Sequence, residues 1–333
     1  MPELRQNIIT RDWVIIATER ARRPETFVSR REKRAALPLH DPSCPFCPGN
    51  ESQTSAESLR IGDEAAWRTR VVANKFPALV REGMLSRRMS GIHRSMQAVG
   101  YHDVVVEHPR HDAQLPLLRE EEIFDVLSAY QRRYVQVRED GRVETILIFR
   151  NHGVAAGTSQ PHPHSQIVGL PVVPAQVRMR LEIATRYFDE TGECMFCRTV
   201  KDERSSGDRI IFATKHFLSF IPYAALSPFH TWIYPLRHMS SFESCTEDEL
   251  RDLARCLKSV LGRLFHGLND PDYNLLIRSL PTHLVQTDYF HWYMSIVPRI
   301  AISAGFELGS GMFINTAIPE QSAEFLRGIG EAK

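Results

Sequence analysis

The order of apolar and polar positions along the chain predicts a protein in which strands and helices alternate. Between residues 119 and 138, apolar side chains recur every three or four positions, which predicts a helix with one buried face. Runs of β-branched residues at 103–107 and 145–149 predict strands before and after this helix. A second long helix is expected to begin after Thr246, because Thr246-Glu247-Asp248-Glu249 has the form of a capping box and leucines follow on one side.

The same rules assign much of the remaining chain. A helix is expected at 175–188, and residues 8–18 are expected to form two strands around a turn at 10–12. Further strands are predicted at 70–76, 210–212, 217–220, 230–235, 273–277 and 290–297. An arginine-rich segment at 19–34 is expected to be a loop that is either solvated or directed at a phosphate.

The chain also carries an internal duplication. A Cys-x-x-Cys pair, a histidine after a strand, a helix, a strand and a second histidine occur twice in this order. His111 and His162 are 51 positions apart in the first copy, and His238 and His291 are 53 positions apart in the second. Two copies of one unit, rather than two unrelated domains, are therefore predicted.

Length and composition are consistent with this organisation. A chain of 333 residues suits two domains, which we expect at 1–172 and 173–333, each an antiparallel sheet with a packed helix in an α+β protein. The net charge of +1 gives no reason to expect a nucleic-acid or membrane partner. Because the amino terminus lacks the apolar run of a signal peptide and no stretch reaches the length of a membrane helix, a cytoplasmic location is expected.

Four of the six cysteines fall in the two Cys-x-x-Cys pairs, which in a reducing compartment indicates metal binding. The predicted ligand sets are Cys44, Cys47, His111 and His162 in the first half, and Cys194, Cys197, His238 and His291 in the second. Four nitrogen and sulfur ligands without an open position are typical of structural zinc, so two zinc ions per chain are expected. An empty second site, or iron, is the alternative.

Other histidines compete for these places. His102 and His108 are rivals of His111 for the first site, and His230 is a rival of His238 for the second; the matched spacing favours the sets given above. Cys245 and Cys256 lie outside both pairs and are expected to be ordinary core or surface residues.

The segment His162-Pro163-His164-Ser165-Gln166 is the main candidate for chemistry. On a strand, His162, His164 and Gln166 would share one face. Aligning His162 with His291 sets His164 against Tyr293 and Gln166 against Ser295, so only the first half keeps the second histidine and the glutamine. The shared residues are best explained as structural and the unshared pair as catalytic, although two metal-ligand histidines remain the alternative for His162 and His164.

If His162 binds zinc, His164 is free to react. An imidazole whose far nitrogen is held by an acceptor presents a lone pair to a substrate, and attack on phosphorus would give a phosphorylated or nucleotidylated histidine. The Gln166 amide could donate a hydrogen bond to a phosphate oxygen, while Thr158, Ser159 and nearby backbone could hold another phosphate. A general-base role for His164 in hydrolysis is the enzymatic alternative, and a zinc-stabilised binding protein without turnover is the non-enzymatic one.

With Cys44-Pro-Phe-Cys47-Pro-Gly-Asn50 before it, the string Gly157-Thr-Ser-Gln-Pro-His162-Pro-His164-Ser-Gln166 resembles the galactose-1-phosphate uridylyltransferases. These form the two-domain branch of the histidine-triad superfamily, and the resemblance covers nearly the whole chain. It implies two histidine-triad-like domains, the first catalytic and the second degenerate. It also implies that His164 is the nucleophile, that Gln166 assists it, that the first zinc is held by the predicted ligands and that the protein is a homodimer.

The resemblance extends to residues that would contact substrate. It implies that Arg20 and Arg23 contact nucleotide phosphates, that Asn74 and Phe76 lie near the nucleoside, and that Asn151 and Gly157 belong to the loop ahead of the motif. Phe306 and Glu307 would lie near the sugar-phosphate end, contributed by the same or the neighbouring subunit; an ordinary surface position is the alternative for Glu307.

The implied reaction is a two-step exchange in which His164 takes UMP from UDP-glucose and passes it to galactose 1-phosphate. The second Cys-x-x-Cys, Gly100-Tyr-His-Asp103 and Gly305-Phe-Glu-Leu-Gly309 are more similar to the branch that includes plant ADP-glucose phosphorylases. Those relatives transfer AMP and use phosphate as acceptor. The alternative is therefore an adenylyltransferase of that type.

Overall fold

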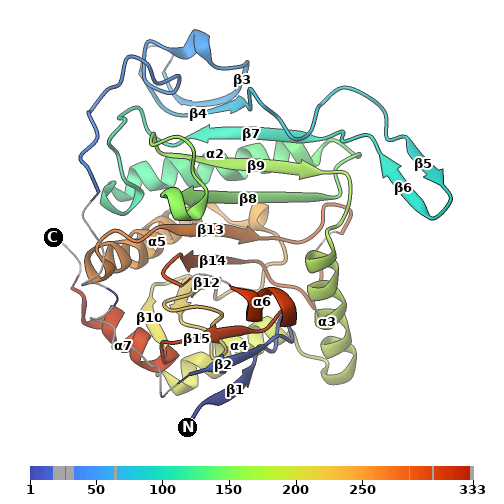
Figure 1. The fold of residues 1–333 in the computed structure, drawn as a ribbon, viewed down its shortest axis with the longest axis vertical. Coiled ribbons are helices and arrows are strands. Elements are labelled where there is room, and N and C mark those ends of the chain that lie inside the picture. Colours follow the sequence, from blue (N-terminus) through green and yellow to red (C-terminus); the bar gives the residue numbers. More distant parts are fainter. Residues whose placement is uncertain (18–26, 28–33, 64–65, 285, 302–303, 331–333) are drawn as a thin grey trace.

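A ten-stranded antiparallel sheet runs through the whole molecule, and the long helices α2 (Glu120–Arg138) and α5 (Glu247–Leu268) pack against each other behind it (Figure 1). The computed structural model describes residues 1–17, 27, 34–63, 66–284, 286–301 and 304–330. The α+β class with antiparallel sheets is confirmed.

The order of strands in the sheet reads the same from both edges, which confirms the duplication. From one edge to the other the strands are β10 (Ile210–Ala213), β11 (Phe217–Phe220), β12 (Thr231–Pro235), β14 (Tyr293–Pro298), β13 (Tyr273–Arg278), β8 (Thr145–His152), β9 (His164–Leu170), β7 (Tyr101–Val106), β4 (Trp67–Ala73) and β3 (Glu57–Gly62). A pseudo-twofold axis between β13 and β8 therefore relates β14 to β9 and β12 to β7. The β9 and β14 strands begin at His164 and Tyr293, the two positions that the sequence alignment pairs.

The two half-sheets are joined, which the sequence did not predict. Strand β13 pairs directly with β8, with Asn274 opposite Asn151 and Leu276 opposite Phe149. The main apolar core lies between the sheet and the two long helices and contains residues of both halves, including Ile167 and Ile277. The division at residue 172 stays a prediction.

Both long helices form as their patterns predict. In α5 the Thr246 hydroxyl accepts a hydrogen bond from the Glu249 backbone N–H, and the Glu249 carboxylate accepts one from the Thr246 N–H at 2.8 Å, which confirms the capping box. Three acidic residues lie in the first turn of each helix, where they interact favourably with the helix dipole.

Smaller elements surround the main sheet. A second sheet is made of β1 (Glu3–Gln6), β2 (Trp13–Ile16) and β15 (Phe313–Asn315), and a separate hairpin of β5 (Arg87–Ser90) and β6 (His93–Met96) projects to one side (Figure 1). In the described part of the chain the other helices are α3 (Ala175–Thr191), α4 (Met195–Ser206), α6 (Gly305–Ser310) and α7 (Pro319–Gly328), with single 3-10 turns at η2 (Glu51–Gln53), η3 (Leu115–Leu117), η4 (Val154–Ala156) and η5 (Phe242–Ser244).

Two local predictions are corrected. The second strand expected within 8–18 forms as β2, but its partner is β1, before residue 8, because the Asn7 side chain accepts hydrogen bonds from the N–H groups of Ile9 and Thr10 and holds the segment between the strands as a loop. Strand β9 begins at His164, so His162 precedes the strand and does not share its surface. Within the described residues, no helix has the combination of length and apolar character that crossing a bilayer requires.

Candidate functional site

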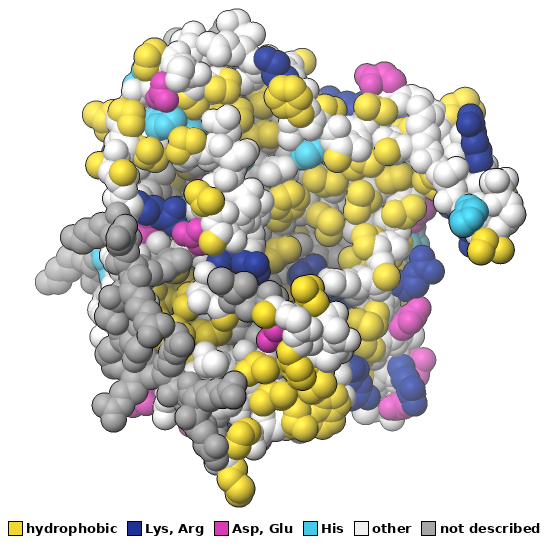
Figure 2. Space-filling view, viewed as in Figure 1, with side chains coloured by type: hydrophobic (Ala, Val, Ile, Leu, Met, Phe, Trp, Pro, Cys, Tyr) yellow, Lys and Arg dark blue, Asp and Glu magenta, His cyan; other side chains and the backbone are white. Residues whose placement is uncertain are grey.

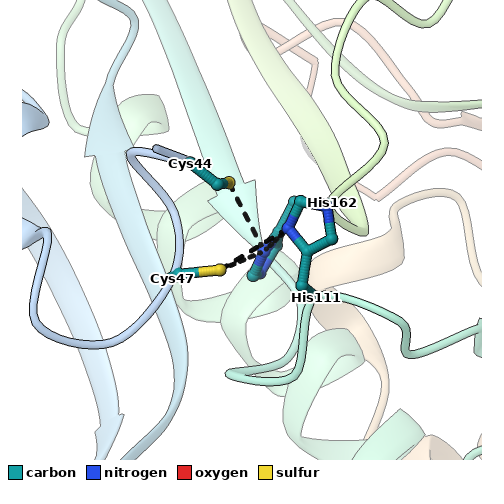
Figure 3. Close-up of side chains that lie close together, drawn as sticks. All are labelled: Cys44, Cys47, His111 and His162. Atoms are coloured by element: carbon teal, nitrogen blue, oxygen red, sulfur yellow. Dashed lines mark hydrogen bonds between the residues drawn. The ribbon is translucent and has the colours of Figure 1, made fainter. Parts of the chain in front are cut away.

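The four side chains predicted for the first metal site lie together and converge on one point, as Figure 3 shows. The two cysteines come from the loop before η2, whereas the two histidines follow β7 and precede β9. All four are nearly fully buried. This site is assembled from segments far apart in sequence, so an ion bound here would fasten the cysteine loop to the sheet.

The spacing of the ligand atoms fits zinc. The Cys47 sulfur lies 3.5 Å from His111 Nδ1 and 3.7 Å from His162 Nδ1, and the two Nδ1 atoms are 3.3 Å apart. A tetrahedral ion with bonds of about 2.0 to 2.3 Å holds its ligand atoms about 3.3 to 3.8 Å apart. His162 Nε2 lies 2.8 Å from the His108 carbonyl oxygen, to which it donates, and this leaves Nδ1 free to bind a metal.

The second predicted set forms a matching cluster. Cys194 is the N-cap residue of α4 and Cys197 lies in its first turn. The Cys197 sulfur lies 3.2 Å from His238 Nδ1 and 3.4 Å from His291 Nδ1, and His238 Nε2 donates to the Thr287 carbonyl oxygen at 2.8 Å. The rival histidines belong to neither of these two clusters of described residues.

His164 begins β9 on the face opposite the long helices. Its Nδ1 donates to the His162 carbonyl oxygen at 2.8 Å, so in the neutral ring the lone pair is on Nε2. Burial lowers the pKa of His164, because the imidazolium form loses hydration, and this favours the neutral ring. The ring of Phe46, which lies between the two cysteines of the first metal site, packs 5.7 Å from the His164 ring, centre to centre. A metal at that site would therefore also fix one wall around the imidazole.

Two cavities meet at His164. One, of about 340 Å³, is lined by Asn151 near the end of β8 and by Thr158, Ser159 and other residues of the loop that follows. The other, of about 310 Å³, is lined by Asn74, Phe76 and Gln166. His164, Ser159 and Gln160 line both cavities. The arrangement suits a ligand with two parts joined at a group that the His164 Nε2 atom can reach. Figure 2 shows a hollow in the face of the molecule that is opposite the long helices.

The residues expected to contact substrate are only partly brought together. Asn74, Phe76, Asn151, Thr158 and Ser159 line the cavities; the Asn151 Oδ1 atom accepts from Asn274, which leaves its NH₂ group available to a ligand. Gly157 lines neither cavity and ends η4 with a φ of +90°, a left-handed conformation that favours glycine.

Other expected contacts lie elsewhere. Phe306 and Glu307, in α6, line neither cavity, and the Glu307 carboxylate accepts a hydrogen bond from the backbone N–H of Ala304. Arg20 and Arg23 lie outside the described residues. The roles of these four residues stay predictions.

A buried polar network under β9 was missed in the sequence. Glu107 forms two hydrogen bonds of 3.0 Å with the Arg150 Nε atom, and it also accepts from the Ser165 hydroxyl. Arg150 donates to the Tyr273 hydroxyl at 3.0 Å, across the junction of the two halves. Ser165 and Arg150 are next to His164 and Asn151 in the chain, so this network fixes the backbone that carries both. A charged residue within each apolar strand was the signal available in the sequence.

The corresponding place in the second half is filled. Tyr293 occupies the position of His164, is almost fully buried, and stacks on Tyr234 with 4.9 Å between ring centres. Where Val104 and Val106 face β9 in the first half, Trp232 and Tyr234 face β14 in the second. The larger aromatic rings take up the space that the first half leaves open beside His164.

The comparisons with known proteins agree with these observations. Family models of the N-terminal and C-terminal domains of galactose-1-phosphate uridyl transferase match residues 1–174 and 180–329. ADP-glucose phosphorylase from Arabidopsis thaliana is 38% identical over 334 residues, covering 98% of this chain and 93% of the relative. Galactose-1-phosphate uridylyltransferase from Haemophilus influenzae is 29% identical over 342 residues, covering 99% and 95%.

Solved structures show the same relation. The crystal structure of an ADP-glucose phosphorylase from Arabidopsis thaliana with bound ADP-glucose superposes with a TM-score of 0.84 at 34% identity, covering 99% of this chain and 100% of that one. A structure of uridylyltransferase gives a TM-score of 0.75 at 28% identity, covering 98% and 97%. The matches span both halves of the duplicated fold, and the chain belongs to the galactose-1-phosphate uridylyltransferase family, whose members are nucleotidyltransferases.

Proposed function

We propose that this enzyme transfers the nucleoside monophosphate of a nucleotide sugar through a covalent intermediate on His164. The observation that carries the proposal is the tautomer of His164, whose free Nε2 lies where two cavities meet. In the first step Nε2 forms a bond to the α-phosphorus, the bond from that phosphorus to the bridging oxygen breaks, and the sugar 1-phosphate leaves with the electron pair. In the second step an acceptor phosphate oxygen attacks the same phosphorus and the N–P bond breaks.

The two cavities suit the two parts of such a donor. The ring of Phe76 is 84% exposed at the edge of one cavity, where a base can stack on it, and Asn74 lies beside it. The other cavity offers the Asn151 amide and the hydroxyls of Thr158 and Ser159, which can bind the sugar phosphate. Gln166 is placed to donate to a phosphate oxygen as charge develops there.

Two donors have support. The uridylyl reaction, with UDP-glucose and galactose 1-phosphate, is supported by the family descriptions and by relatives such as the Haemophilus influenzae enzyme. The adenylyl reaction, with ADP-glucose and phosphate, is supported by the higher identity to the plant ADP-glucose phosphorylase over nearly all of both chains. We infer that ADP-glucose is the better donor, because 38% identity over the full chain exceeds 29%.

Both metal sites are proposed to hold structural zinc, and the protein is proposed to be a homodimer. The sulfur and imidazole donors suit zinc, and no substrate-derived ligand is needed to complete either set. Zinc would supply folding energy and hold the loops in place. The cytoplasmic location stays a prediction.

The test is to mix the enzyme with ADP-glucose or UDP-glucose, quench with acid-free denaturant and measure the intact mass. We expect a mass increase of one nucleoside monophosphate with the preferred donor and none with the His164→Ala variant, which should keep two zinc ions per chain. His93→Ala, on the exposed β6 strand, is the matched control and should label as the wild type does. Undiminished labelling of His164→Ala would show that another group is the nucleophile, and labelling by UDP-glucose alone would overturn the choice of donor.

A further inference from the structure

His102 and His230, which the sequence offered only as rival metal ligands, occupy equivalent places in the two halves. Strand β9 begins at His164, which lies opposite Val106 of β7. His102 is four residues before Val106 on the same strand. In the second half Ile233 lies opposite Met294, so Tyr234 lies beside Tyr293, and His230 is four residues before Tyr234. The duplication therefore placed a histidine at this position in both copies.

Each of these histidines contacts the third residue of the strand beside it, which is Gln166 in β9 and Ser295 in β14. His102 Nε2 lies 2.7 Å from Gln166 Oε1, and His230 Nε2 lies 2.9 Å from the Ser295 hydroxyl. The contact is the same in both halves, but only the first half pairs it with a reactive histidine.

The tautomers of the two rings differ. The backbone N–H of Ala78 lies 3.0 Å from His102 Nδ1 and donates to it, so the neutral ring carries its hydrogen on Nε2. In the second half the Trp232 indole N–H lies 3.1 Å from His230 Nε2 and donates to that atom. His102 is therefore a hydrogen-bond donor at Nε2, whereas His230 is an acceptor there.

This tautomer settles which way the Gln166 amide faces. With Nε2 as a donor, the Gln166 atom at 2.7 Å must be the oxygen, and the NH₂ group is directed away from His102. The Asn74 amide nitrogen also lies 3.1 Å from His102 Nε2, but a protonated Nε2 has no lone pair, so this is a contact without a hydrogen bond. The Asn74 oxygen accepts from the Phe76 N–H at 2.9 Å, which fixes that amide independently.

We propose that His102 is a positioning residue for nucleotidyl transfer: it holds the Gln166 oxygen so that the Gln166 NH₂ group donates to the phosphoryl oxygen at His164. The inference rests on the proposed function, because it assigns His102 a part in that reaction. An amide that rotates freely presents its oxygen to the phosphate part of the time, and two oxygens facing each other repel as negative charge develops. Holding the amide in one orientation keeps its NH₂ group on the phosphate oxygen and avoids this repulsion.

The test is a double-mutant cycle on the rate of histidine nucleotidylation, measured in single turnover with saturating donor. We expect His102→Ala to lower this rate by about tenfold or more, since a direct donor of this kind is worth about 10² to 10³ in rate, with little change in the donor concentration that gives half saturation. In a Gln166→Ala background, where there is no amide to orient, adding His102→Ala should change the rate by less than about twofold. Equal losses in both backgrounds would overturn the proposal, because a structural role does not depend on Gln166.

A pair of variants of similar size tests the direction of the hydrogen bond. His102→Gln can keep an N–H facing the Gln166 oxygen and should retain most of the rate, whereas His102→Glu places an acceptor there, turns the Gln166 amide round and should be slower than His102→Ala. Equal rates for His102→Gln and His102→Glu would contradict the proposal. Metal content and melting temperature are measured for each variant. If the wild-type enzyme were not labelled on His164 the proposed function would fail, whereas labelling with an additive cycle would reject the role of His102 alone.

Discussion

At the scale of residues, a few side chains separate the half that carries His164 from its twin. Strands β9 and β14 begin at equivalent positions, yet one presents His164 to two cavities and the other buries Tyr293 among aromatic rings. Beneath His164, the carboxylate of Glu107 and the guanidinium of Arg150 are almost completely shielded from solvent, at 0% and 3% side-chain exposure. Because neither charge has water to solvate it, each depends on the other.

Breaking this pair should be costly. We expect Glu107→Gln to lower the free energy of unfolding by about 3 kcal/mol, since it leaves the Arg150 charge buried without a counter-charge. Urea denaturation followed by tryptophan fluorescence measures the change. Glu190→Gln, which removes an exposed partner of Arg186, is the control and should have no measurable effect. A loss for Glu107→Gln no larger than for the control would show that the buried charge is solvated or compensated elsewhere.

At the scale of elements, local signals in the sequence correspond closely to the observed helix ends. The capping box at Thr246 begins α5, and the apolar stripe that follows is buried against the sheet and against α2. The cap satisfies backbone N–H groups that the first turn of a helix leaves without partners. Since α5 packs against both halves of the core, a change at its first turn affects the stability of the whole sheet.

Removing the cap should have a defined effect. Thr246→Ala is expected to lower the free energy of unfolding by about 1 kcal/mol, because the Glu249 N–H loses its acceptor. The matched control is Thr185→Ala in the middle of α3, where the hydroxyl donates to the Leu181 carbonyl of the same helix and alanine favours the helix. Chemical denaturation of both variants measures the difference, and an equal change in the two would contradict a capping role for Thr246.

At the scale of the whole molecule, the two halves share one sheet and one main core, while each half has its own Cys2His2 cluster. The first cluster adjoins His164 through Phe46. A metal in the second cluster would fasten α4 to the loops that flank β12 and β14, and β14 is three strands away from the strand that carries His164. Loss of the second metal should therefore weaken the fold before it alters the chemistry.

Cys194→Ser tests this separation. We expect the variant to hold one zinc ion per chain in place of two, to melt at a lower temperature in a single transition, and to label His164 at close to the wild-type rate below that temperature. Cys256→Ser, a buried cysteine outside both clusters, should keep both ions while losing some stability through its buried hydroxyl. Loss of labelling with full metal content in Cys194→Ser would rule out a purely structural role for this site.

The sequence by itself determined the features that depend on spacing along the chain. The helix stripes, the capping box, the matched Cys-x-x-Cys and histidine intervals, and the replacement of His164 by Tyr293 in the twin are all local patterns or comparisons of one half with the other. They were sufficient to predict the α+β class, both ligand sets and the position of the candidate nucleophile, because period, spacing and repetition are defined by positions along the chain and do not depend on how distant segments pack.

Only the tertiary structure decided what depends on the pairing of distant strands. His102 and Gln166 are 64 positions apart and meet because Val104 lies opposite Gln166 in the β7 and β9 register. The same kind of pairing joins β8 to β13 into one sheet and brings Glu107 to Arg150, while Phe306 and Glu307 are left away from both cavities. A strand's own residues specify that it is a strand, but its neighbour and register follow from how all the apolar faces are buried together, which no short segment contains.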